Sequence, residues 1–276
     1  MSDHRTHHIT TSDGVSIGGT VHGRGPALVF LQGAAGDGDL DWGRVAEHLA
    51  DRFTCHLPSL RGHGLSGDHP DLRPDRQADD VVAYVDSLGE RTALTGWSGG
   101  ANMALTVAAR SDAVRAVAPF EPAIMPLMDE QMQAVAENSM ADTGRLAAEG
   151  RMTDALRAFL AFPFYDEEIA VADEVGFVEG AGRYVPNLLN FVQHLMASGD
   201  PSFDPAVLGA VSVPVTVVIG ADTKPFFVDS ARYVAEHIPD ARIQEIPGVA
   251  HAAPLTHPEA LAQAFTGILE SHTQPT

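Results

Sequence analysis

Short apolar runs rich in β-branched residues alternate with amphipathic helical stretches along most of this 276-residue chain. This order is typical of a parallel sheet whose strands are joined by crossover helices. The run at residues 27–31, Ala-Leu-Val-Phe-Leu, lacks polar alternation, as expected of a strand covered on both faces. The chain is therefore predicted to have an α/β fold with a mostly parallel sheet. The predicted strands are residues 15–21, 26–31, 53–57, 92–96, 114–120, 213–220 and 242–246.

Residues 122–198 interrupt this alternation. They have helical patterning without a convincing strand, and they hold six of the eight methionines. We predict a helical cap here, inserted into a core formed by residues 1–121 and 199–276. Methionine is flexible and polarisable, so the cluster is consistent either with packing between the cap helices or with an adaptable apolar pocket. On the second interpretation, Met125 and Met128 contact the substrate.

The chain is strongly acidic, with 37 acidic and 17 basic side chains and a formal net charge of -20. A nucleic acid or an anionic membrane surface would be repelled, so a small molecule is the expected partner.

No apolar run approaches the length of a membrane span and no signal peptide is evident, which favours a cytoplasmic location. The single cysteine, Cys55, excludes an intramolecular disulfide. The oligomeric state is not predicted.

Metal and nucleotide chemistry are disfavoured by the motifs that the sequence lacks. There is no Cys-x-x-Cys pair, no His-Glu-x-x-His, no phosphate loop and no dinucleotide fingerprint after the first predicted strand. We expect neither a metal nor a cofactor.

The pentapeptide Gly96-Trp97-Ser98-Gly99-Gly100 lies between a predicted strand and a predicted helix. A G-x-S-x-G pattern in this context is typical of a nucleophile elbow, in which a strained turn exposes the serine hydroxyl. Glycines flank the serine because neighbouring backbone passes close to it. Ser98 is therefore predicted to be a nucleophile.

A serine hydroxyl is a weak nucleophile at neutral pH, so a histidine oriented by a carboxylate must accept its proton. Of the 13 histidines, His251 directly follows the last predicted strand, in Ile246-Pro247-Gly248-Val249-Ala250-His251. We predict that His251 is the general base. His257 stands beside Pro258 at the start of a predicted helix, where a structural role is favoured.

The order of strands, the Ser98 elbow, the segment Arg61-Gly62-His63-Gly64-Leu65-Ser66 and the late His251 together resemble the α/β-hydrolase superfamily over nearly the whole chain. The resemblance implies an eight-stranded sheet, a triad in the order serine, acid, histidine, and no cofactor. It also implies an oxyanion hole formed by the backbone N–H groups of Gly99 and Ala34. Many relatives have His-Gly where this chain has Gln32-Gly33. Gln32, Gly33 and Trp97 are predicted to contact the substrate.

Two carboxylates remain candidates for the triad acid. Asp222 follows the predicted strand at 213–220, close to where most relatives carry the acid, although the usual spacing falls on Thr223. Glu121 follows the strand at 114–120, which resembles the arrangement in zearalenone lactonases. We favour Glu121. Structural roles for both, in a turn for Asp222 and at a helix cap for Glu121, are the competing interpretations.

These residues together predict hydrolysis of a carboxylic ester or lactone of a small, largely apolar substrate through a Ser98 acyl-enzyme. A thioesterase or a carbon–carbon bond hydrolase would use the same triad. A receptor or small-molecule binding protein with the same fold is the alternative outside the enzymes.

Overall fold

A computed structural model describes residues 5–271 of the chain. Its core is one eight-stranded sheet with the strand order β1-β2-β4-β3-β5-β6-β7-β8. The strand β2 (Ser16–Gly23) is antiparallel to β1 (Arg5–Thr10) and to β4 (Thr54–Pro58), and every other pairing is parallel. The predicted mostly parallel sheet is confirmed. The remaining strands are β3 (Ala27–Leu31), β5 (Thr92–Trp97), β6 (Val114–Phe120), β7 (Thr216–Gly220) and β8 (Arg242–Ile246).

The central strand β3 shows how the sheet is covered. All five of its side chains are buried, and they alternate between two hydrophobic cores: Leu28 and Phe30 belong to one, Val29 and Leu31 to the other. Helices α1 (Gly38–Leu49), α11 (Ala253–Thr256) and α12 (Pro258–Ser271) cover the first core. Helices α2 (Pro74–Asp86), α3 (Gly99–Ala108), α9 (Pro205–Gly209) and α10 (Pro225–His237) cover the second. This is a three-layer arrangement, as a parallel sheet requires.

Strand β1 was not among the predicted strands. Its sequence, Arg-Thr-His-His-Ile-Thr, is polar because β1 lies at the edge of the sheet and is largely exposed. Tertiary contacts stabilise it: the ring of His7 packs edge-on against Tyr84, with 5.1 Å between centroids.

The predicted strand at 213–220 begins only at Thr216, since Pro214 has no N–H to donate to a neighbouring strand.

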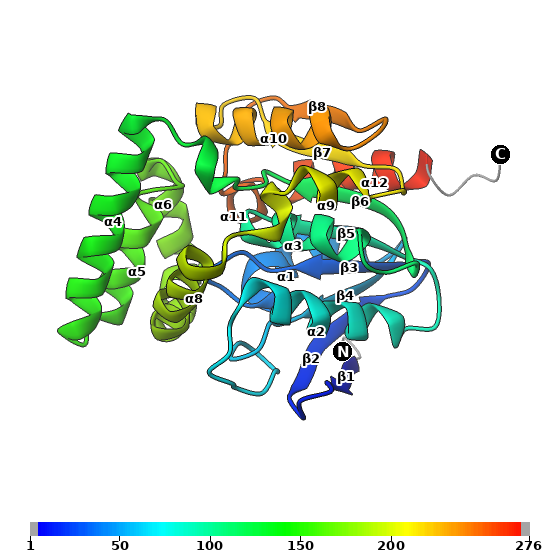
Figure 1. Ribbon diagram of the computed structural model, residues 1–276, viewed down its shortest axis with the longest axis horizontal. Helices are drawn as coiled ribbons and strands as arrows, with labels where there is room; N and C mark the ends of the chain where they lie inside the picture. The colour runs from blue at the N-terminus through cyan, green and yellow to red at the C-terminus, as the bar shows by residue number, and fades with distance from the viewer. Residues whose placement is uncertain (1–4, 272–276) are drawn as a thin grey trace.

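Between β6 and α9 all regular structure is helical (Figure 1). We call residues 125–198 the inserted helices. In Figure 1, α4, α5 and α6 (green) stand beside the sheet, and α8 (yellow-green) lies between them and α2. The long α4 packs against α5. The segment comprises the 3₁₀ turn Met125–Leu127, α4 (Glu130–Ala148), α5 (Met152–Leu160), α6 (Asp166–Glu174), α7 (Phe177–Ala181), the 3₁₀ turn Gly182–Tyr184 and α8 (Val185–Ser198).

None of the helices within residues 5–271 combines the length and apolar character needed to cross a lipid bilayer.

Candidate active site

Ser98 stands at a sharp turn between β5 and α3. Its backbone has φ 57° and ψ -119°, a strained conformation for a residue with a side chain. The turn is held by its N–H, which donates to the Phe120 carbonyl at 3.0 Å. A Cβ on Gly96 would overlap the carbonyl oxygen of Gly100, and one on Gly100 would overlap that of Gln32. The two outer glycines of the pentapeptide are therefore required sterically.

The side chain of His251 meets that of Glu121. Nδ1 of His251 lies 2.6 Å from Oε2 of Glu121, and the side chains are only 3% and 0% exposed. Because an ionised carboxylate only accepts hydrogen bonds, Nδ1 carries the proton and Nε2 has a free lone pair. The contact with Glu121 therefore favours the tautomer with the proton on Nδ1 and leaves Nε2 as an acceptor.

The Glu121 carboxylate receives two further hydrogen bonds. The Gly220 N–H donates to Oε1 and the Thr223 hydroxyl to Oε2, each at 2.8 Å. The backbone of Glu121 has φ 47°, which is uncommon for a residue with a side chain. Strained backbone and three donors together hold the carboxylate in one orientation. Thr223 was not predicted to be a partner of Glu121; its only signal in the sequence is its position where most relatives carry the acid.

Asp222 lies one residue away from Thr223 but takes no part in this arrangement. Its backbone N–H donates to the Val249 carbonyl at 3.0 Å, and its side chain is exposed. The structure therefore brings His251 together with Glu121 and not with Asp222.

Aromatic rings enclose the His251 imidazole. Phe227 of α10 stacks on it with 3.7 Å between centroids and 13° between planes. Trp97, beside Ser98, lies at 5.8 Å, and Phe164, from the inserted helices, at 6.0 Å. Phe164 also stacks on Trp97 at 5.9 Å. The inserted helices therefore form one wall around the histidine.

Ala34 and Gly99 line one cavity of about 30 Å³ beneath α8. No described group accepts a hydrogen bond from the backbone N–H of either residue. The cavity thus brings together two residues whose backbone N–H groups have no acceptor in the described part of the chain, and such a pair of donors can stabilise an oxyanion. The lining residues are Gln32, Gly33, Ala34, Leu60, His63, Leu72, Gln77, Gly99, Met103 and Phe191.

The predicted substrate contacts divide into three groups. Gln32 and Gly33 line the cavity. Trp97 packs against Phe164 beside His251. Met125 and Met128 do not line the cavity; they pack on a separate apolar cluster formed by Ala123, Phe162, Phe226 and Phe227.

Two buried side chains hold the loop that carries Ala34. Gln32 Oε1 accepts from the Leu60 N–H at 2.8 Å, and its Nε2 donates to the Gly36 carbonyl at 2.7 Å. Its amide thus braces the loop. Asp41 Oδ2 accepts from the Gly33 N–H at 2.6 Å, and burial raises the pKa of Asp41 well above its ordinary value. Asp41 was not among the predicted site residues, and its only signal in the sequence is that it is a charged residue next to Trp42.

The inserted helices are joined to the core next to His251. Glu168 of α6 is buried, and its Oε1 accepts from the Ala252 N–H at 2.6 Å. In addition, the ammonium of Lys224, a residue of the core, donates to the carbonyls of Phe162 and Phe164 at 2.7 and 2.8 Å. Both contacts fix the segment that contains Phe164. No sequence pattern pointed to either residue.

Within residues 5–271 no three His, Cys, Asp or Glu side chains are grouped so as to hold a metal ion.

A sequence model of the alpha/beta hydrolase family matches residues 21–264, which is most of the chain. The chain belongs to the alpha/beta hydrolase family. This hydrolase is similar to a pimeloyl-[acyl-carrier protein] methyl ester esterase of Chromobacterium violaceum, with 29% identity over 90% of this chain and 96% of the relative. It is also similar to a 2-(acetamidomethylene)succinate hydrolase of Mesorhizobium japonicum, with 25% identity over 90% of each chain.

Among solved structures, the hydrolase is similar to an alpha/beta hydrolase from Sphaerobacter thermophilus. The TM-score is 0.77 at 26% sequence identity, and the match covers 95% of this chain and 100% of the other. The similarity extends over the sheet and the inserted helices alike, because nearly the whole of each chain is matched.

Proposed function

We propose that this hydrolase cleaves a carboxylic ester or lactone of a small, largely apolar substrate through an acyl-enzyme on Ser98. The observation that carries the proposal is the buried hydrogen bond between Glu121 and His251, which leaves the Nε2 lone pair of His251 available as a base. The relative from Chromobacterium violaceum, named as a methyl ester esterase, supports an ester as the bond cleaved.

In the first half-reaction Ser98 Oγ bonds to the carbonyl carbon while its proton passes to His251 Nε2. Glu121 stays ionised and stabilises the imidazolium that forms. The tetrahedral intermediate then collapses: the bond to the leaving alkoxide breaks, and the alkoxide takes the proton from His251. A water molecule, activated by the same histidine, releases the acid from Ser98 by the reverse sequence.

The negative charge on the carbonyl oxygen develops where Ala34 and Gly99 present their backbone N–H groups. Each such donor is typically worth a factor of about 10²–10³ in turnover. Gln32 and Asp41 position these donors through the loop that they brace.

We further propose that residues 122–198 act as a cap over this site. Phe164 beside His251 and Phe191 above the cavity both come from this segment. A cavity of about 30 Å³ holds little more than a water molecule, so a substrate enters only when the cap moves. The apolar side chains of Leu60, Leu72, Met103 and Phe191 favour an apolar acyl group.

A panel of p-nitrophenyl esters of increasing acyl length, together with aliphatic lactones, tests the proposal. We expect turnover of short acyl esters by the wild-type protein and none by Ser98→Ala. Folded wild-type protein that hydrolyses no ester or lactone, but binds one stoichiometrically, would instead indicate a binding protein.

A further inference from the structure

His63 is a buried histidine that the proposed mechanism does not use. It lies in the loop between β4 and α2, is 6% exposed, and lines the same cavity as Ala34 and Gly99. Nδ1 of His63 lies 3.1 Å from the Arg61 carbonyl oxygen, whereas Nε2 has no hydrogen-bond partner in the described part of the chain. A buried polar atom without a partner is uncommon and requires an explanation.

The contact with Arg61 determines what Nε2 offers. A carbonyl oxygen only accepts, so the proton of a neutral imidazole lies on Nδ1 and Nε2 is an acceptor. Burial lowers the pKa of His63, against weaker opposing effects of the Arg61 and Leu60 carbonyls and of Asp37 and Asp68, and so favours the neutral ring. The unsatisfied atom is therefore a lone pair and not an N–H group.

Most of the other side chains that line the cavity do not offer a free acceptor. The Gln32 amide is occupied by Leu60 and Gly36, and Gln77 Nε2 donates to the Leu72 carbonyl at 2.7 Å. Leu60, Leu72, Met103 and Phe191 are apolar. The backbone N–H groups of Ala34 and Gly99 are donors, which the proposed reaction uses for the carbonyl oxygen.

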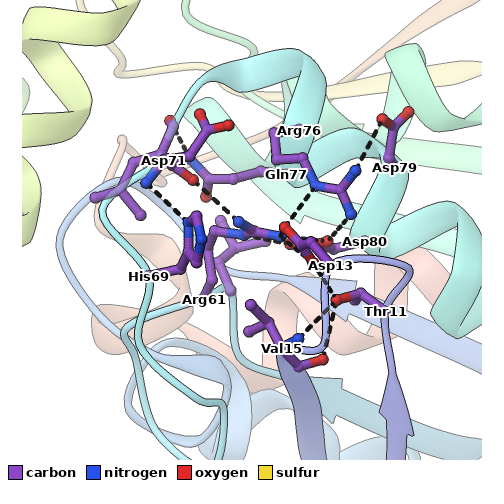
Figure 2. A network of polar contacts seen from close by, with 12 residues as sticks. Thr11, Asp13, Val15, Arg61, His69, Asp71, Arg76, Gln77, Asp79 and Asp80 are labelled. Carbon is purple, nitrogen blue, oxygen red and sulfur yellow. Dashed lines mark hydrogen bonds and ion pairs between the residues drawn. The ribbon is translucent and has the colours of Figure 1, made fainter.

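The loop that carries His63 is held rigidly. Arg61 is fully buried, and its guanidinium donates to both carboxylate oxygens of Asp80, at 2.6 and 2.8 Å, and to those of Asp13, at 3.2 and 3.5 Å. It also donates to the Asp71 carbonyl at 3.2 Å. Figure 2 shows the end of the Arg61 side chain next to Asp13 and Asp80, with Arg76 beside these carboxylates. The His63 ring also packs against Tyr184, with 4.6 Å between centroids. The imidazole is thus preorganised, as a recognition group must be.

We propose that His63 is a substrate-binding residue whose Nε2 accepts a hydrogen bond from a hydroxyl or amide N–H group on the acyl portion of the substrate. This inference rests on the proposed ester hydrolysis, since it places the acyl group in the cavity that contains the oxyanion donors. The substrate class is then an ester of a hydroxyacid or an amido acid. An ester with a second, ionised carboxylate is not favoured, because a neutral acceptor offers it no hydrogen bond.

The test compares p-nitrophenyl esters of butyrate with those of 2-, 3- and 4-hydroxybutyrate and of N-acetylglycine, and includes mono-p-nitrophenyl succinate as the carboxylate. For at least one donor-bearing ester we expect a kcat/KM roughly 10- to 100-fold above that of the butyrate ester, the range expected when a buried acceptor gains its partner. The succinate ester should have no such advantage.

Two variants separate the role of Nε2 from that of the loop. His63→Asn places an amide N–H where Nδ1 donates to Arg61 and removes Nε2, so the advantage should disappear while butyrate hydrolysis persists. His63→Gln can return an acceptor to the position of Nε2 and should restore part of the advantage. His257→Asn, at an exposed histidine, is the matched control and should behave as wild type.

A binding measurement that needs no turnover completes the design. In the Ser98→Ala background we expect 2-, 3- or 4-hydroxybutyramide to bind at least about tenfold more tightly than butyramide, and this difference to vanish with His63→Asn. Equal binding of all four amides, a difference that persists in His63→Asn, or a preference for the succinate ester would overturn the role of His63. If a fluorophosphonate fails to label Ser98 in the folded wild-type protein, that result would instead count against the proposed function.

Discussion

Glu121 Oε2 lies 2.6 Å from His251 Nδ1, although the two residues are 130 positions apart in the sequence. The parallel order of β5, β6, β7 and β8 places the loops after these strands at one edge of the sheet. Ser98, Glu121 and His251 each follow one of these strands. The contact depends on this shared edge and on the strained backbone of Glu121.

Replacing Glu121 with glutamine should reduce kcat by about 10⁴-fold, since the histidine then loses the carboxylate that fixes its tautomer and stabilises its charged form. The exposed Asp222 provides the control, and Asp222→Asn should have a kcat within about twofold of wild type. Steady-state kinetics on one p-nitrophenyl ester measures both. Wild-type activity in Glu121→Gln would remove Glu121 from the mechanism.

Thr223 should assist catalysis through Glu121 alone. Removal of its hydroxyl in Thr223→Val deletes one of the hydrogen bonds that orient the carboxylate, at a cost of about 1 kcal/mol, or roughly fivefold in kcat, with KM unchanged. Thr223→Ser retains a hydroxyl and should recover most of the rate. An equal loss in both variants would indicate a packing role for Thr223.

The buried carboxyl of Asp41 should make stability depend on pH. Burial is the main reason that its pKa is raised, while the Gly33 N–H opposes the shift and Asp37 adds to it. The folded state therefore holds this proton where the unfolded chain, with an aspartate pKa of about 3.9, releases it. The contribution of Asp41 to the free energy of unfolding is therefore fully present below the pKa of the unfolded chain. It is lost as the pH rises through the pKa of the folded state.

Asp41→Asn removes this titration and keeps an acceptor for Gly33. Urea unfolding from pH 4 to pH 8 measures the free energy of unfolding of the variant and of the wild type. We expect the difference, variant minus wild type, to increase with pH. A difference that stays constant or falls across this range would mean that Asp41 is charged in the folded protein.

Glu168 should connect the inserted helices to the position of His251. Glu168→Ala removes the acceptor for the Ala252 N–H, with an expected loss of about 1–3 kcal/mol of stability and a decrease in kcat of about tenfold. Glu167, exposed on the same turn of α6, supplies the matched control, and Glu167→Ala should change neither quantity. A loss of stability with unchanged kcat would restrict Glu168 to a structural role.

The buried strands of the sheet could be predicted because their side chains are apolar, whereas the exposed edge strand could not. The fully apolar β3 is recognisable because both of its faces are covered, whereas the polar β1 is stabilised by backbone pairing and by contacts such as His7 with Tyr84, which no local pattern reveals. The helical pattern of residues 122–198 was likewise evident from periodicity, and all regular structure between Met125 and Ser198 is helical.

The site was predictable only in part, for physical reasons. Glu121 and Asp222 follow the neighbouring strands β6 and β7, so both reach the same edge of the sheet, and the sequence leaves the choice open. The hydrogen bonds from Gly220 and Thr223, which orient Glu121, depend on tertiary structure. The same holds for the placement of Phe191 over the cavity.

The role of Ser98 is tested most directly by a fluorophosphonate probe and mass spectrometry of the intact and digested protein. Wild-type protein should gain one probe, on the peptide that contains Ser98, with loss of esterase activity in proportion. Ser98→Ala should neither be labelled nor retain more than about 10⁻⁶ of the wild-type kcat. Ester hydrolysis by folded protein without labelling of Ser98, or labelling of another residue that accounts for the activity, would contradict the acyl-enzyme mechanism.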